Sequence, residues 1–311
     1  FPKSLKAQDV LNVLVGSCSE NGLKFVYSSP VENIEYRNDL YTLRCGDQLY
    51  ESKKLIIATG GCSYPATGSD GGFFRILREM GFEIKQLSPA LAPVYTEQYP
   101  YESLSGISFR KAEAAVGPVK NKGALLLTHT CFSGPAVLNL SRYAHPGDTI
   151  TFNYFPGKPE DLIYKELVRM ASSSGKQLLT VLYEYFNVDS QADGNSLPAP
   201  ELPKRFLETV CGRAGAEASE KASRISPAQL KNIIGHIAHD SYRIRKLGGY
   251  ESAMVTAGGV ALSEIDTKTM ESVRYKNLFF AGEVLDVDGD TGGYNLQFAF
   301  SSGCLAARSA F

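Results

Sequence analysis

The apolar residues near the start of the chain recur at the spacing of a helix, and Ser4 before them is a typical N-cap residue. The positions that share this helical face are Val10, Leu11, Leu14 and Val15. Short runs with strand character follow at 25–28, 31–36, 40–45 and 48–50, separated by turn residues. The sequence therefore predicts a helix followed by a small antiparallel meander.

An unbroken apolar run at 55–58, after Lys54, leads directly into the turn Thr59-Gly60-Gly61. A run of this kind is typical of a strand buried on both faces, as in a parallel sheet. Asp70 is then expected to cap a helix that ends near Met80. Strand, glycine turn and helix in this order indicate an α/β nucleotide-binding fold.

The predicted secondary structure changes from mixed to mainly strand, and then to mainly helix, after this unit. Residues 91–155 are rich in strand patterns, with one helix expected to start at Ser133. Residues 159–241 have helical patterns, with a polar loop at 189–196 and a last helix opened by Ser226-Pro227. Strand patterns then return at 252–256 and 278–283, before a final helix from 295 to about 309. The middle therefore reads as an insertion into a domain formed by the two ends.

Length, charge and cysteine content narrow the function classes. A chain of 311 residues exceeds what one hydrophobic core usually holds, and its net charge of -1 does not indicate general nucleic-acid binding. The six cysteines contain no CxxC pair, which argues against a zinc ribbon or a disulfide framework and favours the cytoplasm. Apolar runs fall far short of the ~20 residues that span a bilayer. We expect neither a metal site nor a membrane anchor.

The strongest chemical signal lies between 278 and 297. A buried strand ending in Gly282-Glu283 lets the backbone approach a ligand and offers a carboxylate to a sugar hydroxyl. Gly292-Gly293 then leads to a helix N-terminus, whose free N–H groups and dipole favour negative charge on a bound cofactor. The alternative is an ordinary strand, turn and helix whose glycines serve backbone geometry alone.

These segments together resemble the BaiN/YhiN type of FAD-dependent oxidoreductase, a family that also includes an aminoacetone oxidase. The resemblance spans essentially the whole chain. Its matching stretches are Phe1-Pro2-Lys3-Ser4, Ala58-Thr59-Gly60-Gly61, Leu127-Thr128-His129, Ser133-Gly134-Pro135-Ala136, Val255-Thr256-Ala257-Gly258-Gly259-Val260 and Ala281-Gly282-Glu283 through Gly303.

The resemblance implies an α/β fold: a glutathione-reductase-like FAD/NAD(P)-binding Rossmann domain, interrupted by a β-rich insert and a helical insert. The FAD domain would comprise 1–88 and 258–311, the β-rich insert 89–157 and 241–257, and the helical insert 158–240. FAD would contact Thr59, Gly60, Gly61, Gly282, Glu283, Gly292, Gly293, Tyr294, Asn295 and Leu296. The last four would lie at the isoalloxazine ring, where the helix N-terminus would stabilise the anionic reduced flavin at its N1–C2=O edge.

Two residues are candidates for catalysis within this resemblance. His129 follows an apolar strand just before a helix N-terminus, where it would act as a proton donor facing the flavin; the alternative is a hydrogen-bonded structural histidine. Tyr294 beside the flavin would orient the substrate, or only pack.

One element of the family is missing from the sequence. The first βαβ unit, ~30 residues with G-x-G-x-x-G, should precede Phe1, and no such motif occurs in the chain. The FAD domain is therefore expected to be incomplete, so this chain alone should be inactive and free of FAD. The full-length protein would bind FAD and transfer hydride, with NADH or NADPH as a candidate reductant. The alternative is a flavin-free, shortened homologue that acts as a binding or scaffold module.

The resemblance leaves the substrate open. Family relatives act on small amines, steroid-type acids or RNA uracil, so we expect a small-molecule substrate of unassigned identity without excluding RNA. The sequence predicts no oligomeric state.

Overall fold

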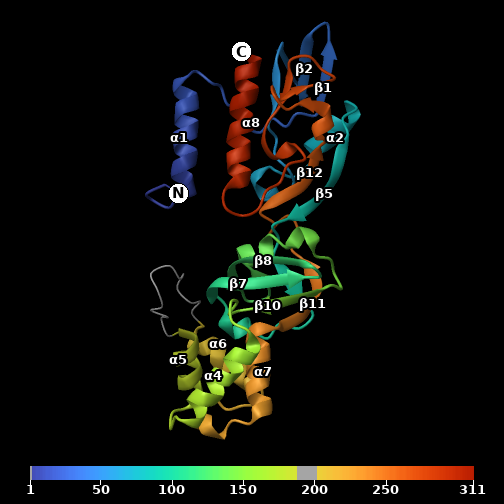
Figure 1. Cartoon of the computed structure of the whole chain (residues 1–311). Coiled ribbons are helices and arrows are strands. Elements are labelled where there is room, and N and C mark those ends of the chain that lie inside the picture. The colour runs from blue at the N-terminus through green and yellow to red at the C-terminus, as the bar shows by residue number, and fades with distance from the viewer. Residues whose placement is uncertain (1, 188–201) are drawn as a thin grey trace. The chain divides into compact units, whose positions relative to one another are not determined.

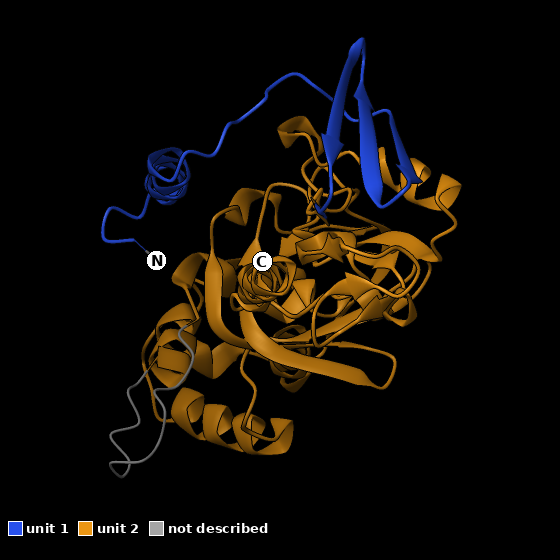
Figure 2. Ribbon diagram, turned by 90° about the horizontal axis from the view of Figure 1, so that it is seen from above, with its two compact units in different colours: residues 1–55 blue, residues 56–311 orange. Residues whose placement is uncertain are grey.

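The computed structural model describes residues 2–187 and 202–311, so the predicted loop at 189–196 lies outside the described residues. The chain separates into two compact units, residues 1–55 and residues 56–311 (Figure 2). This boundary falls inside the segment 1–88 that the sequence assigned to one domain. The three-part division into an FAD domain and two inserts stays a prediction.

The first unit contains one helix and a three-stranded antiparallel sheet of order β1-β2-β3. Its elements are α1 (Ala7–Glu20), β1 (Asn33–Arg37), β2 (Leu40–Cys45) and β3 (Gln48–Ser52). The predicted helix and these strands are confirmed. The strand predicted at 25–28 is wrong, because that segment pairs with no described strand, and Ser28 turns the chain with a φ of +54°.

The start of α1 also differs from the prediction. Lys6, not Ser4, is the N-cap residue, and its side chain makes no capping hydrogen bond. Leu5 has a φ of +57°, so the chain bends between Ser4 and the helix. Helical spacing alone could not reveal this bend.

The second unit contains a four-stranded sheet of order β13-β14-β15-β4, which combines a strand from the start of the unit with three from near its end. Its strands are β4 (Leu55–Ile57), β13 (Ile265–Asp266), β14 (Glu271–Ser272) and β15 (Leu278–Phe280). The strand predicted to be buried on both faces, β4, is covered on one face only. Ile57 is 2% exposed whereas Ile56 is 38% exposed, because the described elements cover only the face that carries Ile57.

Two helices and three short helical turns accompany this sheet in the chain, and the sequence predicts only the two helices, α2 and α8. The five elements are η1 (Pro65–Thr67), α2 (Phe73–Glu79), η5 (Leu262–Glu264), η6 (Gly282–Val284) and α8 (Tyr294–Ala310). Asp70 is not the N-cap residue of α2: that residue is Gly72, whose N donates a hydrogen bond to Asp70 Oδ1 at 2.8 Å. The predicted final helix is confirmed as α8.

A closed six-stranded barrel of order β10-β11-β6-β9-β8-β7 forms the middle of the second unit (Figure 1). Its strands are β6 (Val94–Thr96), β7 (Ser108–Val116), β8 (Val119–Leu127), β9 (Phe132–Ser133), β10 (Thr149–Asn153) and β11 (Asp240–Leu247). Short helical turns connect them: η2 (Glu102–Leu104), α3 (Pro135–Leu138) and η3 (Ser141–Tyr143). The helix expected at Ser133 starts at Pro135, because Ser133 still pairs with Leu126 of β8.

Between β10 and β11, the described residues form four helices and one short turn: α4 (Glu160–Ser172), α5 (Leu178–Asn187), α6 (Lys204–Arg213), η4 (Ala222–Arg224) and α7 (Pro227–Ala238). The predicted start of α7 is confirmed by a capping box. Ser226 Oγ accepts from Gln229 N at 3.2 Å, and Gln229 Oε1 accepts from Ser226 N at 3.0 Å.

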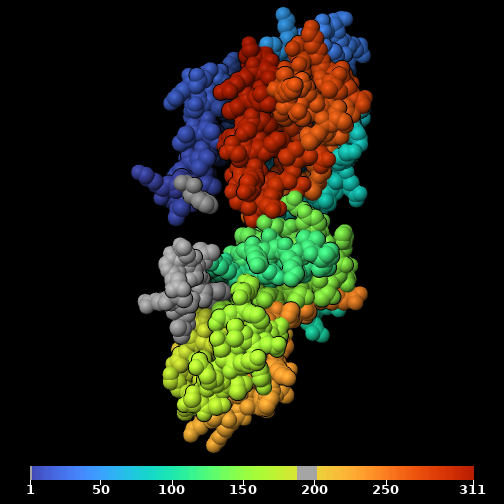
Figure 3. Space-filling view, viewed as in Figure 1, coloured from blue at the N-terminus to red at the C-terminus, as the bar shows by residue number. Residues whose placement is uncertain are grey.

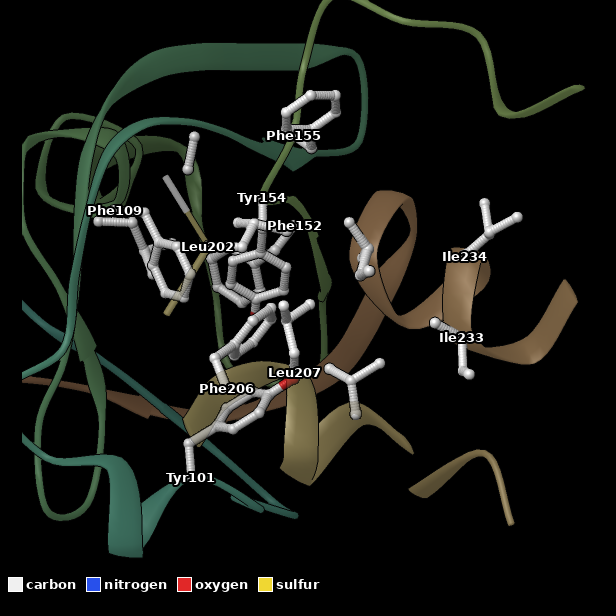
Figure 4. Packing of buried hydrophobic residues seen from close by; sticks show 14 of the residues in the cluster. Tyr101, Phe109, Phe152, Tyr154, Phe155, Leu202, Phe206, Leu207, Ile233 and Ile234 are labelled. Carbon is white, nitrogen blue, oxygen red and sulfur yellow. The ribbon is translucent and has the colours of Figure 1, made fainter. Parts of the chain in front are cut away.

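One hydrophobic core runs through the barrel and these helices. Phe206 of α6 packs against Tyr101, Phe109 and Tyr154 from the barrel, with ring centroids 5.8, 4.8 and 4.7 Å away (Figure 4). Because the core is shared, the barrel and the helices support each other's packing.

A two-stranded antiparallel ribbon carries the chain into the barrel and back. Its strands are β5 (Ile84–Ala90) and β12 (Val255–Val260), which run side by side in Figure 1. The strand predicted at 252–256 thus starts later, at Val255. Ribbon and barrel together bring residues 56–90 next to residues 255–296.

Candidate functional site

The turn after β4 is the first predicted cofactor contact. Thr59 is exposed, Gly60 is half-buried and Gly61 is buried. A Cβ on Gly61 would lie 2.5 Å from Thr256 Oγ1 and 2.6 Å from Glu283 Oε1. The chain therefore needs glycine here because two side chains from distant segments approach the backbone.

Thr256 lies at the centre of a junction that it forms with Gly61 and Glu283. Its side chain is fully buried, and its Oγ1 accepts hydrogen bonds from Cys62 N at 2.7 Å and Ser63 N at 3.1 Å. These bonds tie β12 to the turn after β4. Sequence reasoning missed Thr256 as a site residue; the only signal was its place in the segment 255–260.

Glu283 lies on the other side of the same junction. Its Oε1 accepts a hydrogen bond from Thr256 N at 2.8 Å. Burial raises the pKa of the Glu283 carboxyl, and the hydrogen bonds from Thr256 oppose this shift in part. Glu283 therefore has a structural partner in the protein, which the sequence did not indicate.

The raised pKa of Glu283 predicts how the stability of the fold depends on pH. The folded chain keeps the Glu283 proton to a higher pH than the unfolded chain, whose Glu pKa is about 4.5. The stabilisation is thus fully present below that value and is lost as the pH rises through the folded pKa. Glu283→Gln should remove this dependence while keeping an acceptor for Thr256 N. Thermal denaturation from about pH 4 to about pH 8 measures the difference.

Glu264 provides a control of opposite sign. Hydrogen bonds from Arg274, at 2.6 and 2.9 Å, lower the pKa of the Glu264 carboxyl. Its stabilisation is present above the unfolded pKa and is lost as the pH falls. The difference between parent and Glu264→Gln should therefore grow with pH, while that for Glu283→Gln shrinks. Parallel pH curves for the two variants would contradict this assignment.

Gly282 opens η6, directly after β15, and contacts the helix α8. Its backbone N donates to Ser302 Oγ at 2.9 Å, and a Cβ on Gly282 would lie 3.6 Å from the Ala299 Cβ. That is an ordinary van der Waals distance, so the feature of buried Gly282 that favours glycine is its φ of +74°.

The N-terminus of α8 has no side-chain cap. Gly292 and Gly293 precede the helix with φ values of +124° and +95°, a region that other residues rarely adopt. Tyr294 and Leu296 are 64% and 67% exposed, and α8 lies on the surface shown in Figure 3. The helix thus presents its first N–H groups at an accessible, electropositive end.

The Asn295 side chain has a different role from its backbone. Its Oδ1 accepts from Gly289 N at 2.8 Å, and its Nδ2 donates to Gly289 O at 3.0 Å. Thr291 N in the same loop donates to Asn139 Oδ1 of the barrel segment at 2.9 Å. The helix start is therefore held from two sides, by the Asn295 side chain and by Asn139.

The two candidate catalytic residues lie on different elements. Tyr294 opens α8, whereas His129 is exposed in the turn between β8 and β9, where Thr128 Oγ1 accepts from Cys131 N at 3.0 Å. Among residues 2–187 and 202–311, no hydrogen bond, ion pair or ring contact joins His129 to the segment 282–296. The structure thus brings Gly61, Glu283, Gly282 and α8 together, but not His129.

The described part of the chain holds no group of three or more His, Cys, Asp or Glu side chains placed to bind a metal ion. None of its helices combines the length and apolar character needed to cross a membrane.

Comparison with known proteins shows the family of this chain. The family model described as "HI0933-like protein Rossmann domain" matches residues 1–309. A protein named ribosomal RNA dihydrouridine synthase from Haemophilus influenzae is 32% identical over 310 residues, covering 97% of this chain and 72% of that protein. The Escherichia coli protein of the same name is 29% identical over 308 residues, with coverages of 97% and 72%.

A third relative has a different name. A 3-dehydro-bile acid delta(4,6)-reductase from Clostridium scindens is 27% identical over 314 residues, covering 100% of this chain and 75% of that protein. The family match extends over both units of the structure and includes every segment of the junction described above. The chain therefore belongs to the HI0933-like Rossmann family, which confirms its resemblance to the BaiN/YhiN type.

Proposed function

We propose that this chain acts in an FAD-dependent oxidoreductase whose flavin carries hydride transfer. The observation that carries the proposal is the accessible, uncapped N-terminus of α8 after Gly292-Gly293. It follows β15 and the Glu283 junction in the chain, as a flavin-binding strand and helix would. The family match and the relative named as a reductase support oxidoreductase chemistry.

The residues of the junction fit FAD. The backbone N–H groups of Tyr294, Asn295 and Leu296 would bind the electronegative edge of the flavin ring, because a helix leaves these donors without internal partners. Thr59 and Gly60 would lie along the bound FAD, since Gly61 already occupies the space between Thr256 and Glu283. When bound, FAD would supply the hydride chemistry, and the protein would supply binding and orientation.

Glu283 has two tasks in this proposal. Its Oε1 holds Thr256 N, which fixes β12 against the end of β15. The carboxylate would also face a ribityl or phosphate-side hydroxyl, as the Gly-acid pattern suggests. NADH or NADPH would act as reductant, and the substrate remains a small molecule of unassigned identity.

The proposal predicts which forms of the protein bind flavin. We expect the 311-residue chain to purify without FAD, and a form extended to the length of the relatives to purify yellow. A pyrophosphate cradle contributes several charge-assisted contacts of ~1.5 to 3 kcal/mol each, and G-x-G-x-x-G does not occur in this sequence. Absorption spectra of both forms, followed by anaerobic reduction with NADH or NADPH, measure this.

Each outcome of this experiment discriminates between two functions. A flavin band in the extended form that bleaches with a reduced nicotinamide supports the oxidoreductase. A stoichiometric band in the 311-residue chain would overturn the expected need for a further cradle. An extended form that stays colourless after FAD titration would favour the alternative, a flavin-free binding or scaffold module.

A further inference from the structure

Arg142, in the turn η3 of the insert, reaches across to the loop 286–293 that leads into α8. Its Nη2 lies 3.0 Å from Asp288 Oδ2 and 3.5 Å from Asp290 Oδ1. The same nitrogen donates to Gly289 O at 3.3 Å. One side chain of the insert thus contacts three successive residues of the loop.

The surroundings make this contact stronger than an ordinary surface ion pair. The Arg142 and Asp288 side chains are only 21% and 19% exposed. Burial raises the pKa of the Asp288 carboxyl; Arg142 opposes this shift, while Asp286 and Asp290 add to it. Three carboxylates therefore share a loop in which Arg142 supplies positive charge, and solvent screens the Arg142–Asp288 pair only weakly.

The loop is also fixed at its neighbouring positions. Asn139 Oδ1 accepts a hydrogen bond from Thr291 N. The Asn295 side chain accepts from Gly289 N and donates to Gly289 O. Arg142 and Asn139 come from the insert, whereas Asn295 belongs to α8 itself. Without Arg142 the loop would keep its hydrogen bonds to Asn295 of α8 but lose its ion pairs with the barrel segment.

We propose that Arg142 is a positioning residue that fixes the loop 286–293, and through it Gly292-Gly293 and the start of α8, for flavin binding. This inference rests on the proposed function. Arg142 acts in two ways. It holds the loop through its hydrogen bond to Gly289 O and its ion pairs with Asp288 and Asp290, and it offsets carboxylates that would otherwise oppose negative charge at the end of α8.

The first test needs no cofactor. Hydrogen–deuterium exchange of the 311-residue chain should show about tenfold faster exchange in residues 286–297 for Arg142→Met, the factor expected from one lost charge-assisted hydrogen bond. Amides of the barrel strands should be unchanged. Arg243→Met is the matched control, because Arg243 pairs with Glu97 on the barrel surface and is 64% exposed. Unchanged exchange at 286–297 in Arg142→Met would overturn the proposal.

The second test uses the extended, flavin-binding form. Arg142→Met should bind FAD about tenfold more weakly and lower the flavin reduction potential, because uncompensated carboxylates disfavour the reduced anion. Arg142→Lys keeps the charge but not the planar fork, so it should restore the potential more than the affinity. Asp288→Asn should raise the potential, since it removes a carboxylate.

The two tests separate this inference from the proposed function. If the parent binds no FAD, the proposed function fails, and the exchange experiment still decides whether Arg142 fixes the loop. If the parent binds FAD and Arg142→Met keeps both affinity and potential, the positioning role fails alone.

Discussion

Replacing Asp240 with alanine is expected to destabilise the protein by about 3 to 5 kcal/mol, the cost of breaking a buried ion pair. Asp240 is 2% exposed, and its Oδ1 accepts from Arg213 Nη2 at 2.9 Å. Its Oδ2 accepts from the hydroxyls of Tyr101, Tyr154 and Tyr242. The variant would leave a guanidinium and three buried hydroxyls without their acceptor. Urea denaturation followed by circular dichroism measures the loss.

A nearby surface pair provides the control for this prediction. Glu160 of α4 lies within ion-pair distance of His239, but the two side chains are 41% and 68% exposed. Glu160→Ala should therefore change stability by less than about 1 kcal/mol. Arg213→Met combined with Asp240→Leu should recover part of the loss, because no charge is then buried alone. Equal effects of Asp240→Ala and Glu160→Ala would refute the role of the buried network.

Gly61→Ala is expected to destabilise the second unit by about 3 kcal/mol, through overpacking at the junction. The new Cβ would lie 2.5 Å from Thr256 Oγ1 and 2.6 Å from both Thr256 Cβ and Glu283 Oε1. Thr256 cannot move aside, because it is fully buried and holds Cys62 N and Ser63 N. Thermal denaturation measures the loss, and FAD affinity should fall with it in the extended form.

Gly68→Ala is the matched control. Gly68 lies in the same loop with a φ of +99°, but nothing lies within 4 Å of an added Cβ. Its cost should be limited to backbone strain of roughly 1 to 2 kcal/mol. A smaller effect of Gly61→Ala than of Gly68→Ala would show that the junction has room that the structure does not indicate.

Elements with strong local signals were predictable from sequence. The start of α7 follows from Ser226, Pro227 and Gln229, which interact within one turn of chain. The strand β2 follows from local alternation and flanking turns. Backbone bends such as that at Leu5, and the lack of a partner for 25–28, depend on tertiary surroundings that no local pattern encodes.

The site divides in the same way. Gly282, Gly292 and Gly293 could be singled out because their motif lies in one continuous segment. The partners that hold the site could not, because they come from far away in the chain: Thr256 bonds to Cys62 across 194 positions, and Asn139 bonds to Thr291 across 152. Hydrogen bonds over such separations depend on how the intervening barrel and helices fold, which residue types alone do not specify.

The ribbon of β5 and β12 has a consequence for the order of folding. Forming the Cys62 to Thr256 hydrogen bond in an otherwise unfolded chain would require closing a loop of 194 positions. Loop-closure entropy opposes this, and contacts of high sequence separation form slowly. Once the barrel and its helices have formed, Ala90 and Val255 are paired neighbours, and the remaining loop is short. The barrel and its helices should therefore fold first and act as the template on which the junction of Gly61, Thr256 and Glu283 assembles, so a variant that slows barrel formation should delay the junction by the same factor.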